Sequence, residues 1–377
     1  MSMGGLTTRA PTSASSRISP GQSPAGRPLI DFPLERIQEM EIRPKRQEGS
    51  LMSNTCVGIV TYNPDIQRLL ENISAILLQT TQVIVVDNGS VNISEIQSAC
   101  STIQNLTLAK NAENKGIAKA LNQLCKMAMG YGYGWILLLD QDSVAPEDML
   151  GELEHHRRPE VGLVCPQIID RRRLDHEVPV PDGETYALKT AARKGAITSG
   201  SLVNLSAYMK VGGFDDRMFI DYVDYDFDKR LLLAGYIILR TGLTYLLHEC
   251  GHMEPTKLWV PRRDQSGKWS LEHFYSFGHS PGRCYYKARN RIIYTRKYWR
   301  YAHPLEFAGV FQLPFTIGLT LAFESDRKEK AKAFARGIRS GLLVQLDASA
   351  PSAPRPSRGS GRDDPAHLRL KRHIRRR

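Results

Sequence analysis

The sequence lacks several features that would decide its class at once. No apolar run is both free of charge and long enough to cross a bilayer, and no apolar stretch near the start has the pattern of a signal peptide. The six cysteines are scattered without CxxC spacing, so we expect reduced, buried thiols rather than a zinc site or disulfides. A GxxxxGK[ST] loop and a strand-linked GxGxxG are also missing, which disfavours a P-loop ATPase and a dinucleotide-dependent enzyme.

Both ends of the chain are poor in acidic and large apolar residues. Residues 1–27 contain six Ser, three Pro and no Asp or Glu, and residues 355–377 carry nine Lys or Arg against two Asp. The net charge of +12 therefore describes a basic tail more than a basic domain. Because such segments cannot bury enough apolar surface, we predict a disordered leader over residues 1–50 and a disordered basic tail over residues 346–377.

Between these ends, short apolar runs alternate with segments that have the apolar spacing of helices. Strands are predicted at residues 57–61, 83–87, 106–109, 135–139 and 161–164. The first helix is predicted over residues 63–79, with Asn63 as its N-cap and Pro64 as its first residue. Strands buried on both faces and alternating with helices indicate an α/β fold with a Rossmann-like, mostly parallel sheet. We assign this domain to residues 51–255, followed by a basic, aromatic and helical region over residues 256–345.

Four successive predicted strands end in polar residues, which is where open α/β sheets bind ligands. The sharpest of these ends is Asp140-Gln141-Asp142, because two carboxylates one residue apart can both reach Mg²⁺ or Mn²⁺. An isolated motif of this length is more often a strand-end turn followed by a helix cap. The polar ends at residues 61–63, 87–90 and 111–116 favour the metal site instead.

The order of these motifs resembles that of the inverting glycosyltransferases of family 2, which have the GT-A fold, and more narrowly the bacterial rhamnosyltransferases of that family. The resemblance extends over about residues 55 to 340. It rests on residues 60–63, 85–90, 114–118, 140–142, 212–215, 219–226 and Arg230, and the narrower match on residues 221–224, 248–251, 279–281, 285–286 and 289–290. It implies metal-dependent transfer of a sugar, most specifically L-rhamnose from dTDP-rhamnose, onto a lipid-linked or polysaccharide acceptor in cell-surface glycan synthesis.

The resemblance also implies roles for individual residues. The nucleotide sugar would be bound by residues of the strand ends, namely Thr61, Tyr62, Asn63, Asp87, Asn88, Asn114, Gly116 and Asp140. Asp140 and Asp142 would hold the Mg²⁺ or Mn²⁺ ion, with His248 as a third ligand and His252 as a weaker candidate. A histidine at a strand end is as often structural, so both interpretations of His248 stay open.

Inversion needs a single in-line displacement, and hence a base for the acceptor hydroxyl. The alignment makes Asp224 that base, but Val223 replaces the first acid of the family's pair, which leaves room for Asp221 to assist or to be the base itself. For Asp226 and Asp228 we expect only the preference of a helix start for acidic residues. The acceptor or the diphosphate would be contacted by four residues: Ser199, Gly200, Arg283 and Arg289.

Residues 283–300 combine seven Lys or Arg with five aromatic residues and no acid. This pattern suits nucleic acid, an anionic membrane surface, or a core helix pair with a solvated basic face. Residues 305–323 contain one charged residue but are interrupted by glycine and proline, so they fit an interfacial position better than a membrane span. We expect peripheral contact with the cytosolic face of the bacterial inner membrane and no nucleic-acid partner.

Three other functions share some of these sequence features. Another hexosyltransferase of the same family would use a UDP- or GDP-sugar. A sugar nucleotidyltransferase would need a Gly-rich phosphate loop, which residues 57–63 do not provide. A nucleic-acid-binding protein would leave the carboxylates at the strand ends unexplained, because they repel phosphate without a metal.

Overall fold

The computed structural model describes residues 54–170, 183–189, 195–248, 254–263, 269–276, 278–300 and 310–346. The leader predicted over residues 1–50, nearly all of the tail predicted over residues 346–377, and His252 lie outside these ranges.

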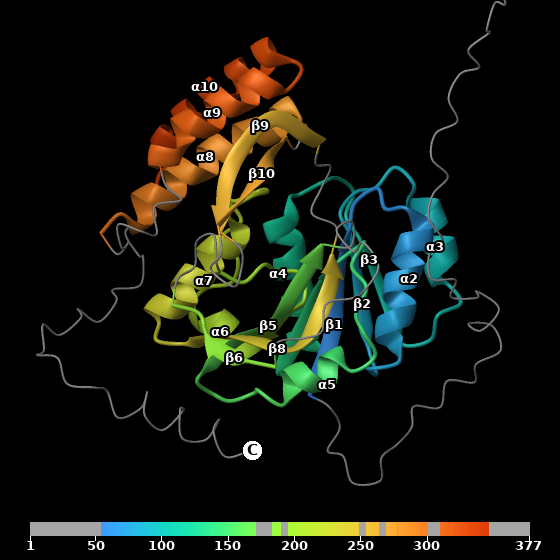
Figure 1. The fold of residues 1–377 in the computed structure, drawn as a ribbon. Helices are drawn as coiled ribbons and strands as arrows, with labels where there is room; N and C mark the ends of the chain where they lie inside the picture. The colour runs from blue at the N-terminus through green and yellow to red at the C-terminus, as the bar shows by residue number, and fades with distance from the viewer. Residues whose placement is uncertain are drawn as a thin grey trace, which may run out of the picture. The chain divides into compact units, whose positions relative to one another are not determined.

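An eight-stranded sheet forms the centre of the described fold (Figure 1). The strands lie in the order β3-β2-β1-β4-β7-β5-β8-β6, of which β7 is antiparallel to β4 and β5, and β6 is antiparallel to β8. Their bounds are β1 Thr55–Thr61, β2 Val83–Asp87, β3 Leu106–Lys110, β4 Trp135–Asp140, β5 Val161–Asp170, β6 Thr185–Ala187, β7 Ser201–Asn204 and β8 Ile237–His248. The predicted mostly parallel α/β sheet is confirmed, and the antiparallel direction of β7 and β6 was not predicted.

Helices cover both faces of this sheet because its strands are apolar on both sides. Cys56 and Val60 of β1 pack into one core cluster and Val57 and Ile59 into the other, as the alternation of side chains along a strand requires. The first cluster includes residues of α4 and α7, and the second includes residues of α2 and α5. The helices are α2 Ile66–Leu77, α3 Ile93–Cys100, α4 Ile117–Gly130, α5 Met149–Glu154, α6 Leu205–Lys210 and α7 Val223–Leu233.

The start of the first helix differs from the prediction. Asp65, not Asn63, is the N-cap of α2, and its side chain accepts a hydrogen bond from the backbone N–H of Arg68 at 3.1 Å. Asn63 lies in a left-handed conformation with φ of 48° and belongs to the loop after β1. The five cysteines in the described part of the chain are free and buried, as predicted.

The C-terminal region contains a two-stranded antiparallel hairpin and a group of helices (Figure 1). The elements are β9 Glu254–Arg263, β10 Trp269–Ser276, α8 Pro281–Tyr298, the 3-10 turn η3 Val310–Gln312, α9 Leu313–Phe323 and α10 Arg327–Leu343. Helices α8 and α10 approach so closely that a Cβ atom on Gly337 would lie 2.3 Å from the carbonyl oxygen of Tyr285. Among the described helices, none has both the length and the apolar character of a membrane span.

Candidate active site

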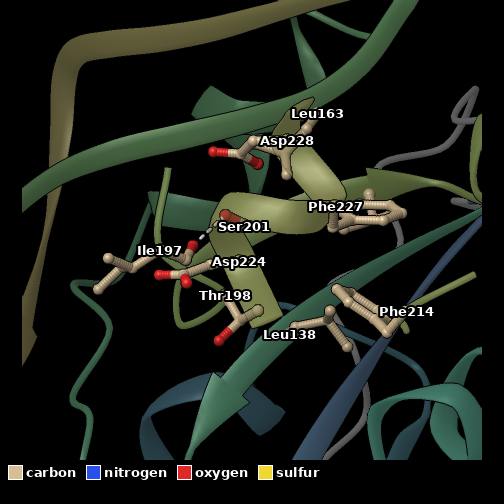
Figure 2. A pocket seen from close by; sticks show the side chains of 10 residues that line it. Leu138, Leu163, Ile197, Thr198, Ser201, Phe214, Asp224, Phe227 and Asp228 are labelled. Atoms are coloured by element: carbon tan, nitrogen blue, oxygen red, sulfur yellow. Dashed lines mark hydrogen bonds between the residues drawn. The ribbon is translucent and has the colours of Figure 1, made fainter. Parts of the chain in front are cut away.

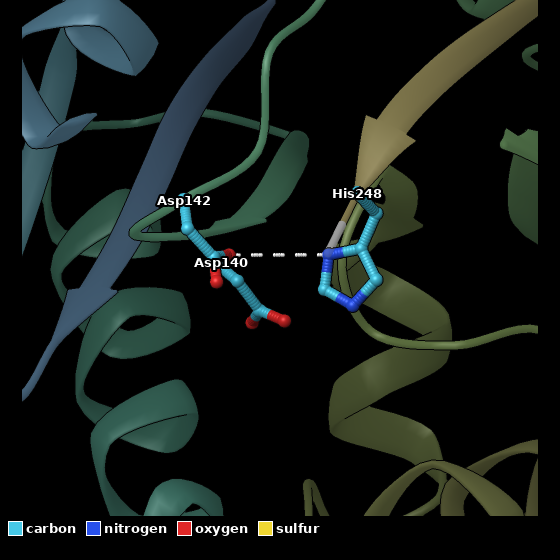
Figure 3. A group of neighbouring side chains, drawn as sticks. All are labelled: Asp140, Asp142 and His248. Carbon is cyan, nitrogen blue, oxygen red and sulfur yellow. Dashed lines mark ion pairs between the residues drawn. The ribbon is translucent and has the colours of Figure 1, made fainter. Parts of the chain in front are cut away.

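Two aspartates and a histidine meet where β4 and β8 end (Figure 3). One ligand atom from each of Asp140, Asp142 and His248 lies within 4.8 Å of the others. The Nδ1 atom of His248 is 4.0 Å from an oxygen of Asp142, and both side chains are partly exposed. The sheet thus joins residues more than a hundred positions apart, because β8 continues the same layer as β4.

Buried polar side chains orient this group from behind. The hydroxyl of Ser143 contacts Nδ1 of His248 at 3.2 Å and the hydroxyl of Ser199 at 2.9 Å. The Ser199 hydroxyl also accepts the backbone N–H of Asp140 at 3.0 Å, and Asn72 donates to the Asp140 carbonyl at 2.5 Å. Sequence reasoning missed Asn72 and Ser143, since a buried polar residue on a helix or in a turn gives no signal of its partner.

The donor set of this group suits a divalent cation. Burial and the nearby charge of Asp142 raise the pKa of Asp140, whereas the charge of His248 lowers it. A cation between the carboxylates would relieve both the burial cost and the mutual repulsion. The two carboxylates provide hard oxygen ligands and the imidazole provides one nitrogen ligand. Mg²⁺ or Mn²⁺ can bind such a set of ligands. The three residues could therefore hold such an ion.

The end of β2 is organised around the carboxylate of Asp87. This side chain is fully buried and accepts hydrogen bonds from Thr61, from the backbone of Gly89, and from the backbone and hydroxyl of Ser90. These bonds draw the ends of β1 and β2 together and shape the turn after β2. In this structure, the Asp87 carboxylate is engaged by the chain itself, and its contact with a base or ribose stays a prediction.

A chain of amides continues from this turn to the start of α4. Asn88 donates to Asn114 at 3.0 Å and accepts from the backbone of Lys115 at 3.1 Å. Gly116 then adopts a φ of 85°, and a Cβ atom at that position would lie 2.6 Å from the ring of Phe219. Glycine is therefore required for this close approach between the start of α4 and the loop before α7.

The loop after β1 is joined to the carboxylate motif by Gln141. The side chain of Gln141 accepts the backbone N–H of Tyr62 at 2.8 Å, and the amide oxygen of Asn63 accepts the backbone N–H of Val91 at 2.9 Å. The Tyr62 side chain is 45% exposed, which leaves its ring available to a ligand. The residue between the two aspartates thus has its own role, which the motif alone did not indicate.

Asp224 lies in the first turn of α7, beside the strand ends (Figure 2). Figure 2 shows it close to Thr198 and one helical turn before Asp228, in a small pocket that these residues line with Leu138 of β4. Burial raises the pKa of Asp224 to about 7, with further contributions from the negative charges of Asp221 and Asp140. In the described part of the chain, no Lys or Arg forms an ion pair with Asp224.

Asp221 has different surroundings, although it lies only three residues away. One of its oxygens pairs with Arg283 at the start of α8, at 3.3 Å. Asp221 and Tyr222 are both left-handed, with φ of 63° and 69°. The buried Asn290 holds this turn by donating to the Asp221 carbonyl at 3.0 Å. Asp221 is thus engaged with a cation, whereas Asp224 is free of one within the described residues.

The helix-start interpretation of Asp226 and Asp228 is insufficient, because both side chains are buried and have specific partners. Asp226 pairs with Arg230 at 2.7 Å and with Lys297 of α8, and it accepts the hydroxyl of Tyr298 at 2.8 Å. Asp228 accepts the backbone N–H of Ala196 at 2.8 Å, and burial raises its pKa well above the ordinary value. Asp226 therefore connects α7 to α8, which an exposed acidic helix start would not do.

The four residues predicted to contact the acceptor or diphosphate lie in different settings. Ser199 and Gly200 are buried behind Asp140, and the backbone N–H of Gly200 donates to the Leu138 carbonyl at 2.7 Å. Arg289 donates to the Arg217 carbonyl at 2.6 Å, so its guanidinium holds the loop before α7. Only Arg283 combines an exposed side chain with a position beside the aspartates.

The basic stretch over residues 283–300 is helix α8, and most of its cations bind other parts of the chain. Arg291 donates to the Tyr222 hydroxyl at 2.6 Å, and Arg296 donates to the Gly341 carbonyl at 2.7 Å. Lys297 pairs with Asp215 at 2.9 Å and with Asp226. These cations therefore attach α8 to the rest of the fold, which accounts for much of the pattern that also suited nucleic acid.

Comparison with known proteins agrees with this geometry. A model of the glycosyl transferase family 2 matches residues 56–212, which span β1 to α6 and include both aspartates of the β4 motif. Residues 56–212 thus form a glycosyltransferase family 2 domain. The chain is a glycosyltransferase, and the family implies a nucleotide-sugar donor; the mostly parallel sheet with its flanking helices is the GT-A fold.

Two relatives extend the similarity beyond the matched domain. The chain is 29% identical over 309 residues to a dTDP-rhamnosyl transferase, RfbF, of Shigella flexneri, covering 78% of this chain and 95% of that relative. It is 27% identical to an N-acetylglucosaminyl-diphospho-decaprenol L-rhamnosyltransferase of Mycobacterium tuberculosis, covering 52% of this chain and 76% of the relative. The predicted resemblance to bacterial rhamnosyltransferases is thus confirmed.

Solved structures show more distant likenesses. S. aureus TarS in complex with UDP-GlcNAc has a TM-score of 0.45 at 15% identity, over 76% of this chain and 80% of that one. GalNAc-T7 with UDP, GalNAc and Mn²⁺ has a TM-score of 0.42 at 12% identity, over 54% of this chain and 44% of that one. These low scores add nothing to the family assignment.

Proposed function

We propose that this family 2 glycosyltransferase transfers L-rhamnose from dTDP-rhamnose, with inversion, onto a lipid-linked or polysaccharide acceptor of the cell surface. The observation that carries the proposal is that Asp224, in the first turn of α7, lies near Asp140 of the Asp140–Asp142–His248 group. The charge of Asp140 raises the pKa of Asp224, so the two carboxyls lie within electrostatic reach of each other. The choice of sugar is supported by the two rhamnosyltransferase relatives.

Asp224 is the proposed base. Its carboxylate takes the proton of the acceptor hydroxyl while the acceptor oxygen bonds to the anomeric carbon of the donor. The bond between that carbon and the diphosphate oxygen breaks on the opposite face, and the proton stays on Asp224. A pKa of about 7 is suited to this role, because a general base is most effective when its pKa lies near the working pH.

The donor is placed at the strand ends in this proposal. Asp140, Asp142 and His248 would hold a Mg²⁺ or Mn²⁺ ion, which when bound neutralises charge on the departing nucleoside diphosphate. Tyr62 and the turn organised by Asp87 would border the nucleotide. Arg283 has an exposed side chain and pairs with Asp221, three residues before the proposed base, so Arg283 is the proposed contact to an anionic acceptor group.

The place of action follows from the acceptor. A lipid-linked saccharide would be met at a membrane surface, so we propose peripheral contact with the cytosolic face of the bacterial inner membrane. A nucleic-acid partner is not part of the proposal, since the cations of α8 are largely engaged within the chain.

The test is a donor screen with purified protein, Mn²⁺ or Mg²⁺, a lipid-linked acceptor and radiolabelled dTDP-, UDP- and GDP-sugars. We expect transfer with dTDP-rhamnose. Asp142→Asn should lose metal-dependent binding of dTDP, and Asp224→Asn should bind dTDP normally but lose transfer. Transfer from a UDP- or GDP-sugar alone would replace the rhamnose assignment with another hexose. Unchanged turnover of Asp224→Asn, with turnover lost in Asp221→Asn, would move the base to Asp221.

A further inference from the structure

Helix α9 is unusual because the side that faces solvent is apolar. Residues 313–323 contain no charged side chain, and Leu313 is buried against α8 and α10. The exposed positions recur with helical spacing and define what we call the outer face of α9: Phe311, Pro314, Phe315, Gly318, Ala322 and Phe323. The Phe315 side chain is 66% exposed and that of Phe311 is 75% exposed. A contiguous apolar surface of this kind marks an interaction site in a folded protein.

The neighbouring helix supplies a complementary charge pattern. Lys328, Lys332, Arg336 and Arg339 of α10 are exposed at spacings of three or four residues, so they form one stripe along the helix. Within residues 278–300 and 310–346 there are thirteen Lys or Arg and three Asp or Glu. Because α10 packs against both α8 and α9, the apolar face and the basic stripe belong to one helical group.

We infer that the outer face of α9 docks on an anionic lipid bilayer. Phe311 and Phe315 enter the boundary between headgroups and acyl chains, and the basic stripe of α10 meets the anionic headgroups. A second copy of the chain fits less well, since pairing two such faces would bring two strongly basic regions together. This inference deepens the membrane contact of the proposed function, because it names the surface that makes that contact.

The same helices connect this face to the active site. Helix α8 packs along α10 at Gly337 and Gly341, and its first turn carries Arg283, which pairs with Asp221 beside the proposed base. A bilayer bound through α9 would therefore be connected through α10 and α8 to the Arg283–Asp221 pair beside the proposed base.

The experiment measures vesicle binding of the full chain by flotation, without any sugar transfer. Vesicles of phosphatidylcholine alone are compared with vesicles that also contain about 30% of the anionic lipid phosphatidylglycerol. We expect binding to the anionic vesicles, weakened in high salt. Phe311→Ser with Phe315→Ser should reduce binding by about tenfold or more, because two aromatic side chains no longer enter the bilayer. Lys328→Gln with Lys332→Gln and Arg336→Gln should remove the preference for anionic vesicles.

A matched control uses exposed apolar residues of the sheet domain. Leu78 is 59% exposed and Met209 is 60% exposed, so Leu78→Ser with Met209→Ser removes similar exposed apolar area far from α9 in the sequence. This control should bind vesicles within about twofold of the wild type. A control that loses binding equally, or a Phe311/Phe315 variant that binds normally, would overturn the inference.

Two further measurements identify other occupants of the face. A dimer seen by light scattering that disappears in the Phe311/Phe315 variant would assign the face to a second copy. A fall in Tm of that variant without vesicles would assign it to another segment of the same chain. Either result overturns the inference. Metal-dependent dTDP binding, measured without vesicles, should be unchanged in the variant, so failure of the proposed donor chemistry and failure of membrane docking give different results.

Discussion

Replacing Asp224 with asparagine should make the protein more stable at neutral and higher pH while it abolishes sugar transfer. Partial burial of the side chain and the negative charges of Asp221 and Asp140 raise its pKa from an ordinary 3.8 to about 7. A carboxyl whose pKa is raised on folding stabilises the folded state only while it is protonated. The contribution is fully present below the unfolded pKa and is lost as the pH rises through the folded pKa.

The size of the effect follows from this shift. The full difference corresponds to roughly 4 kcal/mol, and we reduce it to about 2 kcal/mol because the residue is partly exposed and charges near solvent are screened. Asp224→Asn should therefore raise Tm by roughly 3 to 6 °C at pH 8 in metal-free buffer. The gain should shrink as the pH falls below 7 and nearly vanish below about pH 3, where the wild-type carboxyl is protonated in both states.

Replacing Asp226 with asparagine should instead make the protein less stable. Asp226 is fully buried between Arg230 and Lys297. Asp226→Asn leaves Arg230 without its anion and leaves Lys297 with Asp215 alone, so it should cost about 3–5 kcal/mol of stability. Thermal unfolding of both variants at several pH values tests the pair. If Asp224→Asn lowers Tm at pH 8, or its Tm difference from the wild type does not change with pH, the environment assigned to Asp224 is wrong.

Three other measurements follow from particular contacts. The kcat/KM of transfer should fall about tenfold for each pH unit below about 7, since Asp224 must be ionised to accept a proton. A kcat/KM that stays constant down to about pH 5 would exclude this carboxyl as the base. Ser143→Ala should weaken Mn²⁺ binding by calorimetry about 10- to 100-fold with little change in Tm, because the hydroxyl orients His248; equal affinity would show that it does not. Gly337→Ala should lower the free energy of unfolding by about 1–3 kcal/mol, since its Cβ would meet the Tyr285 carbonyl. Gly318→Ala in α9 has open space around the new Cβ and should be neutral or stabilising. Equal Tm values for the two variants would contradict the close packing of α8 and α10.

The sequence alone predicted most strands and helices of the first half of the fold. Strands such as 83–87 and 135–139 are continuous apolar runs between helical patterns, and local periodicity is enough to identify them. Four strand ends with polar residues also placed the site at one edge of the sheet, because parallel strands bring their carboxyl ends together. The antiparallel direction of β7 could not be seen, since strand direction depends on pairing partners far along the chain.

Tertiary structure decided which acids are available for chemistry. In the sequence, Asp221, Asp224, Asp226 and Asp228 are equivalent members of one acidic run. In the folded chain, Asp221 pairs with Arg283, and Asp226 pairs with Arg230 and Lys297. Asp228 accepts a hydrogen bond from a backbone N–H, while Asp224 has no cationic partner among the described residues. Arg230 lies one turn along α7 from Asp226, whereas the other partners come from α8 and from the segment before β7, up to about seventy residues away. Local pattern specifies which residue types stand on a helix, but only long-range packing determines their partners, and the partners set the charge state of each carboxyl.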